Sequence, residues 1–484
     1  MGRLLWLAIV ALGCREPERT PAARDPVVPP PAPVAGTAPY GGWAVSCAVQ
    51  EANALRVDCT VDGNPPSALE IRFAPADGSL PERAVTGSGP VVTLYGMVEE
   101  TPYTWIATPV GRPEEAVGGT LTTGELSPFL DIAAPAVGPT TATESLLYLY
   151  GCGGGTYAVI TRPDGRLWWY QALDSGLEGF GHNAIALTLT PDDTLLVNLD
   201  RGIVREWDLA GNLLFEVTAN GGDLPRPLHH DLFRRGGYTY MLNAHEETYA
   251  DDPLAYVTDG IYVLDATGVE IASWDLDSFI TPSGDNPLAA GYWRQPFPFG
   301  VDWSHANGLY VEEGTLDLYV SFYMLDTVLK MAGDPLSPDF GTVAWVLPGS
   351  PVSPWWGTGD MVVTSEITED LTFEGQHNPS ILPDGRLLLF DNERSPGDSR
   401  TLVLDLDPDG GTAEIEEAWD LGRLCPIQGS AFPLENGNVI ATCASGTIFY
   451  ELAPGVPDPV RTVTPRCSAG LFFGYVPRAI PISL

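Results

Sequence analysis

One structural unit recurs along the C-terminal two thirds of the chain. Each copy opens on His or another polar residue, continues as a short apolar strand, turns at Asp, Asn or Gly, and returns as a second apolar strand. The copies begin at His182, His229, Ser304, His377 and Gln428, and a further strand-turn-strand segment starts at Thr156. Such a repeat constrains the fold strongly, because each unit must bury its apolar faces against its neighbours.

Most copies continue into a third strand and then a fourth strand that contains a tryptophan. These tryptophans are Trp207, Trp274, Trp345 and Trp419. Four strands in roughly 40 to 70 residues form the blade of a β-propeller. No long pattern of period 3.6 lies between the strands, which argues against a parallel α/β fold. We therefore expect residues 140–484 to form a six-bladed β-propeller, closed by pairing of the tail after Cys467 with the first blade.

Residues 39–128 show a different pattern, in which short alternating runs are separated by turn residues. Examples are residues 44–49, 55–61 and 103–109. Six or seven short strands in this length are typical of a small immunoglobulin- or fibronectin-like β-sandwich. The predicted fold class of the whole chain is therefore all-β, with the sandwich preceding the propeller.

The first residues have the features of an export signal. A short basic start, an apolar stretch over residues 4–12 and Gly13-Cys14 predict a lipoprotein-type signal peptide over residues 1–14, with lipidation of Cys14. Ordinary cleavage and a retained anchor are the alternatives. Residues 15–38 are rich in Pro and predict an extended tether. We expect an exported periplasmic or cell-surface lipoprotein that contacts the membrane only through this anchor.

Six cysteines remain after Cys14, an even number that suits an oxidising compartment. Cys47 and Cys59 lie on neighbouring strand-like runs, so we expect them to form a disulfide. Metal binding by cysteine is not expected, because no CxxC spacing occurs. The other four could pair in several ways: Cys152, Cys425, Cys443 and Cys467.

The charge balance excludes some classes of partner. The chain has 24 Lys and Arg against 63 Asp and Glu, a formal net charge of −39. Phosphate backbones and anionic lipid surfaces require clustered cations, so nucleic acid and an anionic membrane surface are not expected partners. An anionic substrate would have to bind in a local basic pocket.

The six histidines are distributed in register with the repeat. They are His182, His229, His230, His245, His305 and His377, and five of them lie at or beside the start of a unit's first strand. That strand lines the channel of a propeller, so these imidazoles are expected to converge near the axis. Converged imidazoles suit metal binding, acid-base catalysis or nucleophilic catalysis. Strand capping and hydrogen bonds between blades are the structural alternative.

Three segments carry a resemblance to a known family. His229-His230-Asp231, residues 302–307 and Gln376-His377-Asn378 resemble, in order and spacing, signature segments of the arylsulfate sulfotransferases. In that family too a small β-sandwich precedes a six-bladed propeller, and members are exported. The resemblance implies transfer of a sulfuryl group from a phenolic sulfate ester to a phenol through a sulfated histidine. It implies no nucleotide donor and no other cofactor.

The resemblance also implies roles for individual residues. His377 would be the nucleophile, because it takes the place of the family's Gln-His histidine. His305 would bind the sulfuryl oxygens, and His230 would complete the set, with His229 as the other candidate. A bound metal is not expected, although Asp231 and Asp302 could contribute to one. Two amides are further candidates for substrate contact: Asn307 and Asn378.

Two positions depart from the family pattern, and the milder change is Asn378, which stands in place of an aspartate. Tyr323 stands where the family has an arginine, and a phenol supplies neither the charge nor the paired donors of a guanidinium. Arg394 and Arg400 are the candidates to supply that charge to the substrate. The departure favours a second hypothesis, a catalytically inactive propeller lipoprotein that acts as a binding module, whereas the retained histidines favour the enzyme.

A calcium-loop pattern also occurs, from Asp405 to Glu416. It matches the expression for an EF-hand loop. Alternating residues on both sides instead predict a β-hairpin with an Asp-Gly turn. Weak Ca²⁺ binding by this acidic turn is the alternative.

Overall fold

The computed structural model describes residues 34–37, 42–63, 68–130, 132–133, 136–152, 155–173, 184–199, 202–250, 252, 254–283, 296–392, 397–467 and 476–483. The predicted signal peptide with Cys14, most of the tether, His182 and Arg394 lie outside these residues. In the described ranges the helices are three short 3-10 turns: η1 (Pro113–Glu115), η2 (Leu276–Ser278) and η3 (Ala444–Gly446). Strands make up the remaining regular structure, so the all-β prediction is confirmed.

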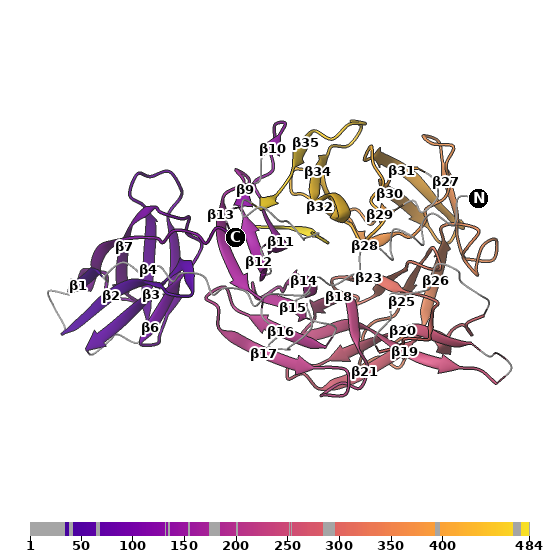
Figure 1. The fold of residues 1–484 in the computed structure, drawn as a ribbon, viewed down its shortest axis with the longest axis horizontal. Helices are drawn as coiled ribbons and strands as arrows, with labels where there is room; N and C mark the ends of the chain where they lie inside the picture. The colour runs from indigo at the N-terminus through magenta and orange to yellow at the C-terminus, as the bar shows by residue number, and fades with distance from the viewer. Residues whose placement is uncertain are drawn as a thin grey trace, which may run out of the picture.

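Two antiparallel sheets of four strands form the N-terminal part, drawn in indigo to violet in Figure 1. One has the order β1 (Val34–Thr37), β2 (Trp43–Gln50), β3 (Asn53–Gly63), β6 (Val91–Leu94). The other has the order β5 (Arg83–Gly87), β4 (Leu69–Pro75), β7 (Pro102–Pro109), β8 (Val117–Thr122). Every second residue of β2 is buried, as expected for a strand with one face on a core.

The Cys47–Cys59 disulfide is present, as predicted. The two cysteines face each other in the β2–β3 register, so the bond joins neighbouring strands of one sheet. The characteristic disulfide of immunoglobulin domains instead links two sheets. This bond therefore stabilises a strand pair and does not connect the two sheets.

Besides one sheet of two strands, the rest of the described chain contains six sheets of four or five strands each, called the large sheets. The first three have the orders β13 (Leu167–Ala172), β12 (Gly155–Thr161), β11 (Ser145–Cys152), β37 (Ala479–Ile482); β14 (Ala184–Leu189), β15 (Leu195–Leu199), β16 (Ile203–Trp207), β17 (Leu213–Thr218); and β18 (Leu228–Arg235), β19 (Tyr238–Thr248), β20 (Ala255–Leu264), β21 (Glu270–Asp275). A short strand, β22 (Val301–Asp302), pairs in parallel with β20.

The next three sheets follow in chain order. Their orders are β23 (Ala306–Val311), β24 (Leu318–Phe322), β25 (Thr327–Met331), β26 (Val343–Pro348); β28 (His377–Ile381), β29 (Leu387–Asp391), β30 (Arg400–Asp407), β31 (Thr412–Asp420), β27 (Val362–Ser365); and β32 (Ser430–Pro433), β33 (Val439–Cys443), β34 (Ile448–Leu452), β35 (Arg461–Val463), β10 (Ala136–Val137). A small two-stranded sheet pairs β9 (Ile132–Ala133) with β36 (Arg466–Cys467).

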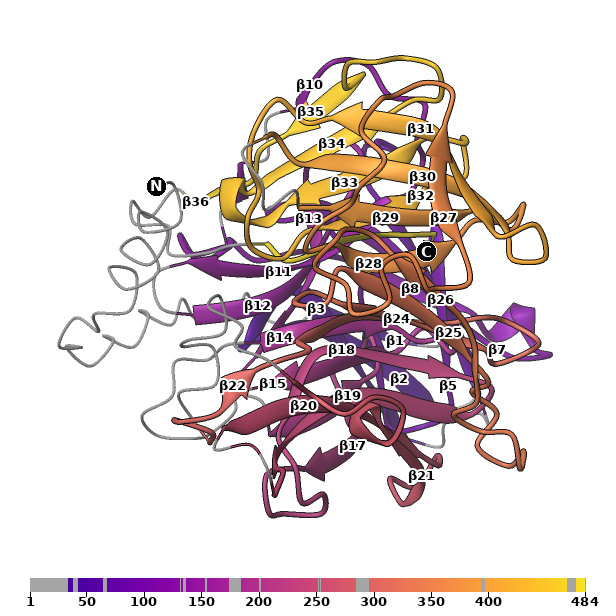
Figure 2. The same ribbon diagram turned by 90° about the vertical axis from the view of Figure 1, so that its right-hand side faces the viewer.

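The six sheets lie around a common centre. Strands β14, β18, β23, β28 and β32 lie nearest that centre in Figure 1. Figure 2 gives the side view, in which the orange and yellow sheets lie above the magenta and red ones. In five of the repeats the first strand is therefore the inner strand of its sheet, and this brings the starts of these strands together. The prediction was wrong for the segment from Thr156, which forms β12 and β13 at the other side of its sheet from β37.

The C-terminal strand closes the arrangement. β37 pairs antiparallel with β11, with Tyr148 opposite Ala479. The expected pairing of the chain's tail with the first unit is thus confirmed. Residues before the first sheet complete the last one in the same way, because β10 pairs with β35.

The tryptophans follow the predicted pattern with one exception. Trp274, Trp345 and Trp419 lie on β21, β26 and β31, the fourth strands of their units. The prediction was wrong for Trp207, which lies on β16, the third strand of its sheet. β16 pairs with β15 and precedes β17 in the sheet order.

The N-terminal sheets pack against the first large sheet through polar and apolar contacts. Asn53 Nδ2 donates to the Tyr170 carbonyl oxygen at 2.9 Å, and the Ala54 amide donates to the Tyr170 hydroxyl at 2.8 Å. The Arg56 guanidinium lies 5.2 Å from the centre of the Trp169 ring. One apolar cluster includes buried residues from both parts, so the two share a core.

The acidic segment from Asp405 forms the predicted β-hairpin. Asp405 pairs with Glu414 and Asp407 with Thr412 between β30 and β31. The Gly410 amide donates to Asp407 Oδ1 in the turn. None of the helices in the described part of the chain has the length and apolar character that a membrane crossing requires.

Candidate active site

The inner strands β18, β23 and β28 share a local distortion where they begin. Each has a register shift in its first residues, between Leu228 and Leu232, Ala306 and Gly308, and His377 and Ser380. A non-glycine residue with a left-handed backbone lies at each: His230 (φ 44°), His305 (φ 51°) and Asn378 (φ 50°). Such a bulge re-aims side chains that a regular strand would send to opposite faces. The strained, left-handed backbone therefore occurs at the same positions where the imidazoles converge.

Three sheets bring their histidines together. The ring centres of His230 and His305 lie 4.7 Å apart, and those of His230 and His377 lie 6.5 Å apart. The Tyr323 ring lies 5.4 Å from His305 and 5.5 Å from His377. All three histidines are buried. The residues predicted to act together therefore lie within one cluster.

A cavity opens on this cluster. It is small and partly open to solvent. Its lining residues are His230, Asn307, His377, Gln428, Gly429, Pro477 and Arg478. Two imidazoles, two amides and one guanidinium thus border one small volume, and these groups can donate hydrogen bonds to an anion.

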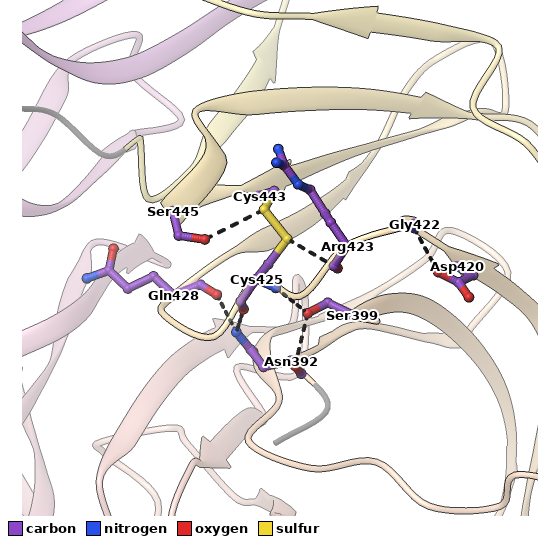
Figure 3. Close-up of a disulfide and its surroundings, with 9 residues drawn as sticks. All are labelled: Asn392, Ser399, Asp420, Gly422, Arg423, Cys425, Gln428, Cys443 and Ser445. Carbon is purple, nitrogen blue, oxygen red and sulfur yellow. Dashed lines mark hydrogen bonds between the residues drawn. A yellow bond between two sulfur atoms is a disulfide. The ribbon is translucent and has the colours of Figure 1, made fainter. Parts of the chain in front are cut away.

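The hydrogen bonds of His377 define its tautomer. Its Nδ1 lies 3.0 Å from the Gly375 carbonyl oxygen and 2.7 Å from Asn392 Oδ1. Asn392 Nδ2 donates to the carbonyl oxygens of Cys425 and Gln428, as Figure 3 shows, so Oδ1 is the atom that faces His377. Both neighbours of Nδ1 are acceptors, so Nδ1 carries the proton and Nε2 carries the lone pair.

The surroundings of His377 also keep its ring neutral. Burial lowers the pKa of His377 to about 3, and the neighbouring charges of His305 and Arg478 act in the same direction. The hydrogen bond to Asn392 opposes this shift without cancelling it. At neutral pH the ring is therefore an uncharged imidazole, the form that can act as a nucleophile.

A second disulfide lies next to Asn392. Cys425 and Cys443 are bonded, a pairing that the sequence left open among several. The Cys425 amide donates to Ser399 Oγ, and Ser399 Oγ donates to the Asn392 carbonyl oxygen, as Figure 3 shows. The disulfide thus fixes the segment whose carbonyl groups orient the Asn392 side chain. The side chains of Cys152 and Cys467 lie outside what the structure describes.

Buried carboxylates lie beside two further histidines. His305 Nδ1 lies 2.5 Å from Asp302 Oδ2. His229 Nε2 lies 3.0 Å from Asp259 Oδ1, and His229 Nδ1 lies 3.0 Å from His230 Nδ1. Sequence reasoning missed Asp259, which lies on β20 outside the three matching segments.

Asp259 is held as a carboxylate. Burial alone would raise the pKa of Asp259, but its hydrogen bonds and the charge of His229 lower that pKa below its usual value. The bonds to its Oδ2 come from Ser304 Oγ and the Ala306 amide. This carboxylate therefore stays ionised beside His229.

Arg478 is the cation at the cavity, and sequence reasoning missed it too. Its guanidinium donates to Asp231 Oδ1 at 2.5 Å. Asp231 Oδ2 accepts the Leu309 amide at 2.7 Å, so the carboxylate is anchored to two sheets. Arg478 directly precedes β37, and the expected pairing of the tail with the first unit was the signal that could have indicated it.

The other predicted substrate-contact residues have different surroundings. Asn307 lines the cavity, donates to the Gln376 carbonyl oxygen and accepts from Ser321 Oγ. Asn378 Oδ1 accepts the Ala431 amide and so joins β28 to β32.

Arg400 is not among the lining residues. Its partners are Asp391, Asp370 and the Thr372 carbonyl oxygen.

His245 lies apart from the site. Its Nε2 is 3.2 Å from Thr258 Oγ1 and 3.4 Å from Asp277 Oδ1. With Asp275 these residues form a group whose spacing could hold a metal ion. The Arg226 guanidinium already bonds to Asp275 with two nitrogens, which supplies the positive charge that an ion would bring.

Solved structures with some likeness to this chain come from several bacteria. A protein of unknown function from Bacteroides caccae is 13% identical, over 70% of this chain and 99% of its own, with a TM-score of 0.40. A virginiamycin B lyase from Staphylococcus aureus is 9% identical, over 68% and 89%, with a TM-score of 0.36. A gluconolactonase from Xanthomonas campestris is 12% identical, over 69% and 90%, with a TM-score of 0.34.

The curated proteins contain no match to this chain. A family model does match: arylsulfotransferase (ASST) matches residues 142–407. That stretch is more than half of the sequence and includes His230, His305 and His377. The resemblance noted from the three histidine segments is thereby confirmed, and the chain belongs to the arylsulfotransferase family.

Proposed function

We propose that this protein transfers a sulfuryl group from a phenolic sulfate ester to a phenol, with His377 as the nucleophile. One observation carries the proposal. His377 is a neutral, buried imidazole on the cavity wall, and its Nδ1 proton is committed to Gly375 and Asn392. Nε2 is then the atom that attacks sulfur, and the product is an N-sulfated histidine.

The cavity supplies groups for the charge that develops on the sulfuryl oxygens. Arg478 is a guanidinium on its wall, and His305 lies within the same cluster. Preorganised donors of this kind stabilise oxyanions in a site from which water is largely excluded. Arg478 thus supplies the positive charge that the family pattern places at position 323. Arg400 has a structural role in its ion pairs.

The architecture and location are parts of the same proposal. We take the six large sheets as the blades of a six-bladed β-propeller over residues 140–484, with β37 completing the first blade. Residues 39–128 are taken as an immunoglobulin-like sandwich. Two disulfides support export to an oxidising compartment, with Cys14 as the lipid anchor.

The test is incubation with 4-nitrophenyl sulfate and a phenol acceptor. We expect release of 4-nitrophenol and formation of the acceptor's sulfate ester. Without acceptor, we expect a burst of about one 4-nitrophenol per chain and an acid-labile sulfated peptide that contains His377. Correctly folded protein that gives neither product nor sulfated peptide would exclude the proposed function.

One observation favours a second candidate, a binding module without catalysis. Tyr323 lies between His305 and His377 at the position where the family pattern has a cation. Under this candidate the cavity would bind a phenolic sulfate without transferring its sulfuryl group. Calorimetry with phenyl sulfate would then show binding, while the burst and the sulfated peptide would be absent.

A further inference from the structure

His229 and Asp259 form a buried ionisable pair behind the cavity wall. Their relative exposures are 1% and 2%, and neither is among the residues that line the cavity. Buried ionisable groups are costly unless they are paired. The nucleophile His377 does not require either residue, so their arrangement calls for another explanation.

The two adjacent histidines on β18 face each other because of the local backbone. Neighbouring residues of a regular strand point to opposite faces. The left-handed φ of His230 and the register shift around it turn both rings to one side, with their centres 5.3 Å apart. Their Nδ1 atoms lie 3.0 Å apart, so one proton lies between them, carried by one ring and accepted by the other.

The far side of His229 is fixed by Asp259. His229 Nε2 lies 3.0 Å from Asp259 Oδ1, an ion-pair distance at which the carboxylate favours a proton on Nε2. Asp259 cannot turn away, because Ser304 Oγ and the Ala306 amide donate to its other oxygen. His229 can therefore gain or lose a proton only at Nδ1, toward His230.

We propose that Asp259, His229 and His230 form a proton relay, in which His230 Nε2 exchanges a proton with the phenol oxygen of the substrate. This proposal rests on the proposed function and assigns its acid and base. His230 lines the cavity and is the only member of the relay that does so. His229 and Asp259 are positioning and proton-holding residues behind it.

The first half-reaction balances as follows. His377 Nε2 forms a bond to sulfur while the bond from sulfur to the aryl oxygen breaks. The departing oxygen takes the proton from His230 Nε2, and the proton between the Nδ1 atoms moves from His229 to His230. The two imidazoles of His229 and His230 together change from a net charge of +1 to neutral. The products are a phenol and sulfated His377.

The second half-reaction reverses these transfers. The acceptor phenol gives its proton to His230 Nε2, and its oxygen attacks the sulfur on His377. The shared proton returns from His230 to His229, where Asp259 stabilises the positive charge. One relay therefore serves as acid and then as base, which general acid-base catalysis through a single site requires.

The test compares donors with good and poor leaving groups. Phenyl sulfate needs a proton on its leaving oxygen, because the pKa of a phenol is about 10. 4-Nitrophenolate leaves more readily and needs the proton less. We expect Asp259→Asn and His229→Gln to slow phenyl sulfate turnover about 100-fold and 4-nitrophenyl sulfate turnover less than about fivefold.

Asp277→Asn is the matched control. It removes a carboxylate beside a histidine, His245, in the same sheet but away from the cavity. We expect its turnover of both donors to equal that of the parent. Equal losses on both donors in Asp259→Asn would overturn the relay, and the sulfated His377 peptide would still show that the proposed function stands.

Nuclear magnetic resonance gives a readout that does not depend on turnover. The chain has six histidines, so ¹⁵N-labelled imidazoles give a sparse spectrum. We expect His229 protonated at Nε2 and a proton shared between the two Nδ1 atoms, which the Asp259→Asn variant loses. A His229 ring with no proton on Nε2 would overturn the relay, and a parent without transferase activity would overturn both proposals.

Discussion

The N-terminal sheets and the inner strands of the large sheets differ in how regularly their residues alternate between the two faces of a strand. In β2 every second residue is buried, and Cys47 lies directly opposite Cys59 in a register that stays regular from Trp43 to Val49. In β18 the first five residues are all buried, and the register shifts among them. The alternation in β2 places one face of the strand on a core. The irregular strands lose the alternation between their two faces, and several of their polar side chains point to one place. The left-handed backbone of His230 is part of this distortion.

The two disulfides follow the same division. Cys47–Cys59 joins neighbouring strands in the regular part. Cys425–Cys443 holds the segment whose carbonyl groups orient Asn392, and Asn392 in turn orients His377. A covalent bond in one region stabilises a fold, whereas in the other it also sets the geometry of a proposed nucleophile.

The largest expected effect comes from removing the nucleophile. We expect His377→Asn to abolish both the 4-nitrophenol burst and the acid-labile sulfated peptide, because an amide cannot form the sulfated imidazole. Rapid-quench kinetics and mass spectrometry measure the two. His245→Asn, which changes a histidine outside the cavity, should retain both. A burst of normal size in His377→Asn would assign the nucleophile to another residue.

The next effect concerns the cation of the cavity. Arg478→Gln should lower kcat/KM by about 10² to 10³, the range reported for removal of one preorganised oxyanion donor. The loss arises because the guanidinium held by Asp231 no longer faces the sulfuryl oxygens. Arg386→Gln, which breaks only surface ion pairs with Asp384 and Glu416, should keep the parent's value. A loss smaller than threefold in Arg478→Gln would remove this residue from the proposed site.

Tyr323→Arg tests whether the two positions are alternatives for one charge. In the Arg478→Gln background it should restore part of the lost kcat/KM, because Tyr323 contacts the rings of both His305 and His377. The single Tyr323→Arg variant should gain less, since Arg478 already supplies a cation. No recovery in the double variant would show that the two positions do not serve the same oxygens.

A smaller effect should separate the two disulfides. Replacing both Cys425 and Cys443 by Ser should slow turnover about tenfold to hundredfold, because a small displacement of the nucleophile is costly. Replacing both Cys47 and Cys59 by Ser should leave turnover unchanged and lower the free energy of unfolding by about 3 kcal/mol. Steady-state kinetics and denaturant titration measure the two effects. The reverse pattern would contradict the division between the regions.

The smallest expected change is in the acid limb of the pH profile. The pKa of His377 is about 3 and that of a free imidazole is about 6.5, so the folded ring stays neutral where the unfolded one is protonated. The 4-nitrophenol burst rate should therefore not fall between about pH 7 and about pH 5. Quenched-flow measurement of the burst would contradict this if it showed a fall with an apparent pKa near 6.5.

The same pKa shift has a consequence for stability. Below pH 6.5 the unfolded chain takes up a proton at His377 that the folded chain does not. His377 therefore makes the folded state less stable as the pH falls from about 6.5 toward 3, and this loss is absent above that window. The contribution can be isolated by comparing the parent with His377→Asn.

Much of the fold could be predicted from local sequence alone. Alternation of apolar residues gave the strands and the all-β class, because the side chains of a strand alternate between its faces. The repeat placed His230, His305 and His377 at equivalent positions, so their convergence followed from the architecture. Adjacent strand-like runs were enough to pair Cys47 with Cys59. Each of these features depends on residues that are near one another in sequence or in register with the repeat.

The remaining parts of the site depended on the tertiary structure. Arg478 enters the cavity because β37 pairs with β11, and the carboxylate that holds it, Asp231, lies 247 residues away in sequence. Asp259 on β20 contacts His229 on β18, with β19 between these strands in the sheet order. Cys425 forms a disulfide with Cys443 next to Asn392. A local pattern specifies which face of a strand a side chain occupies. It does not specify which distant group is brought opposite that face, because those contacts form only when the sheets pack together.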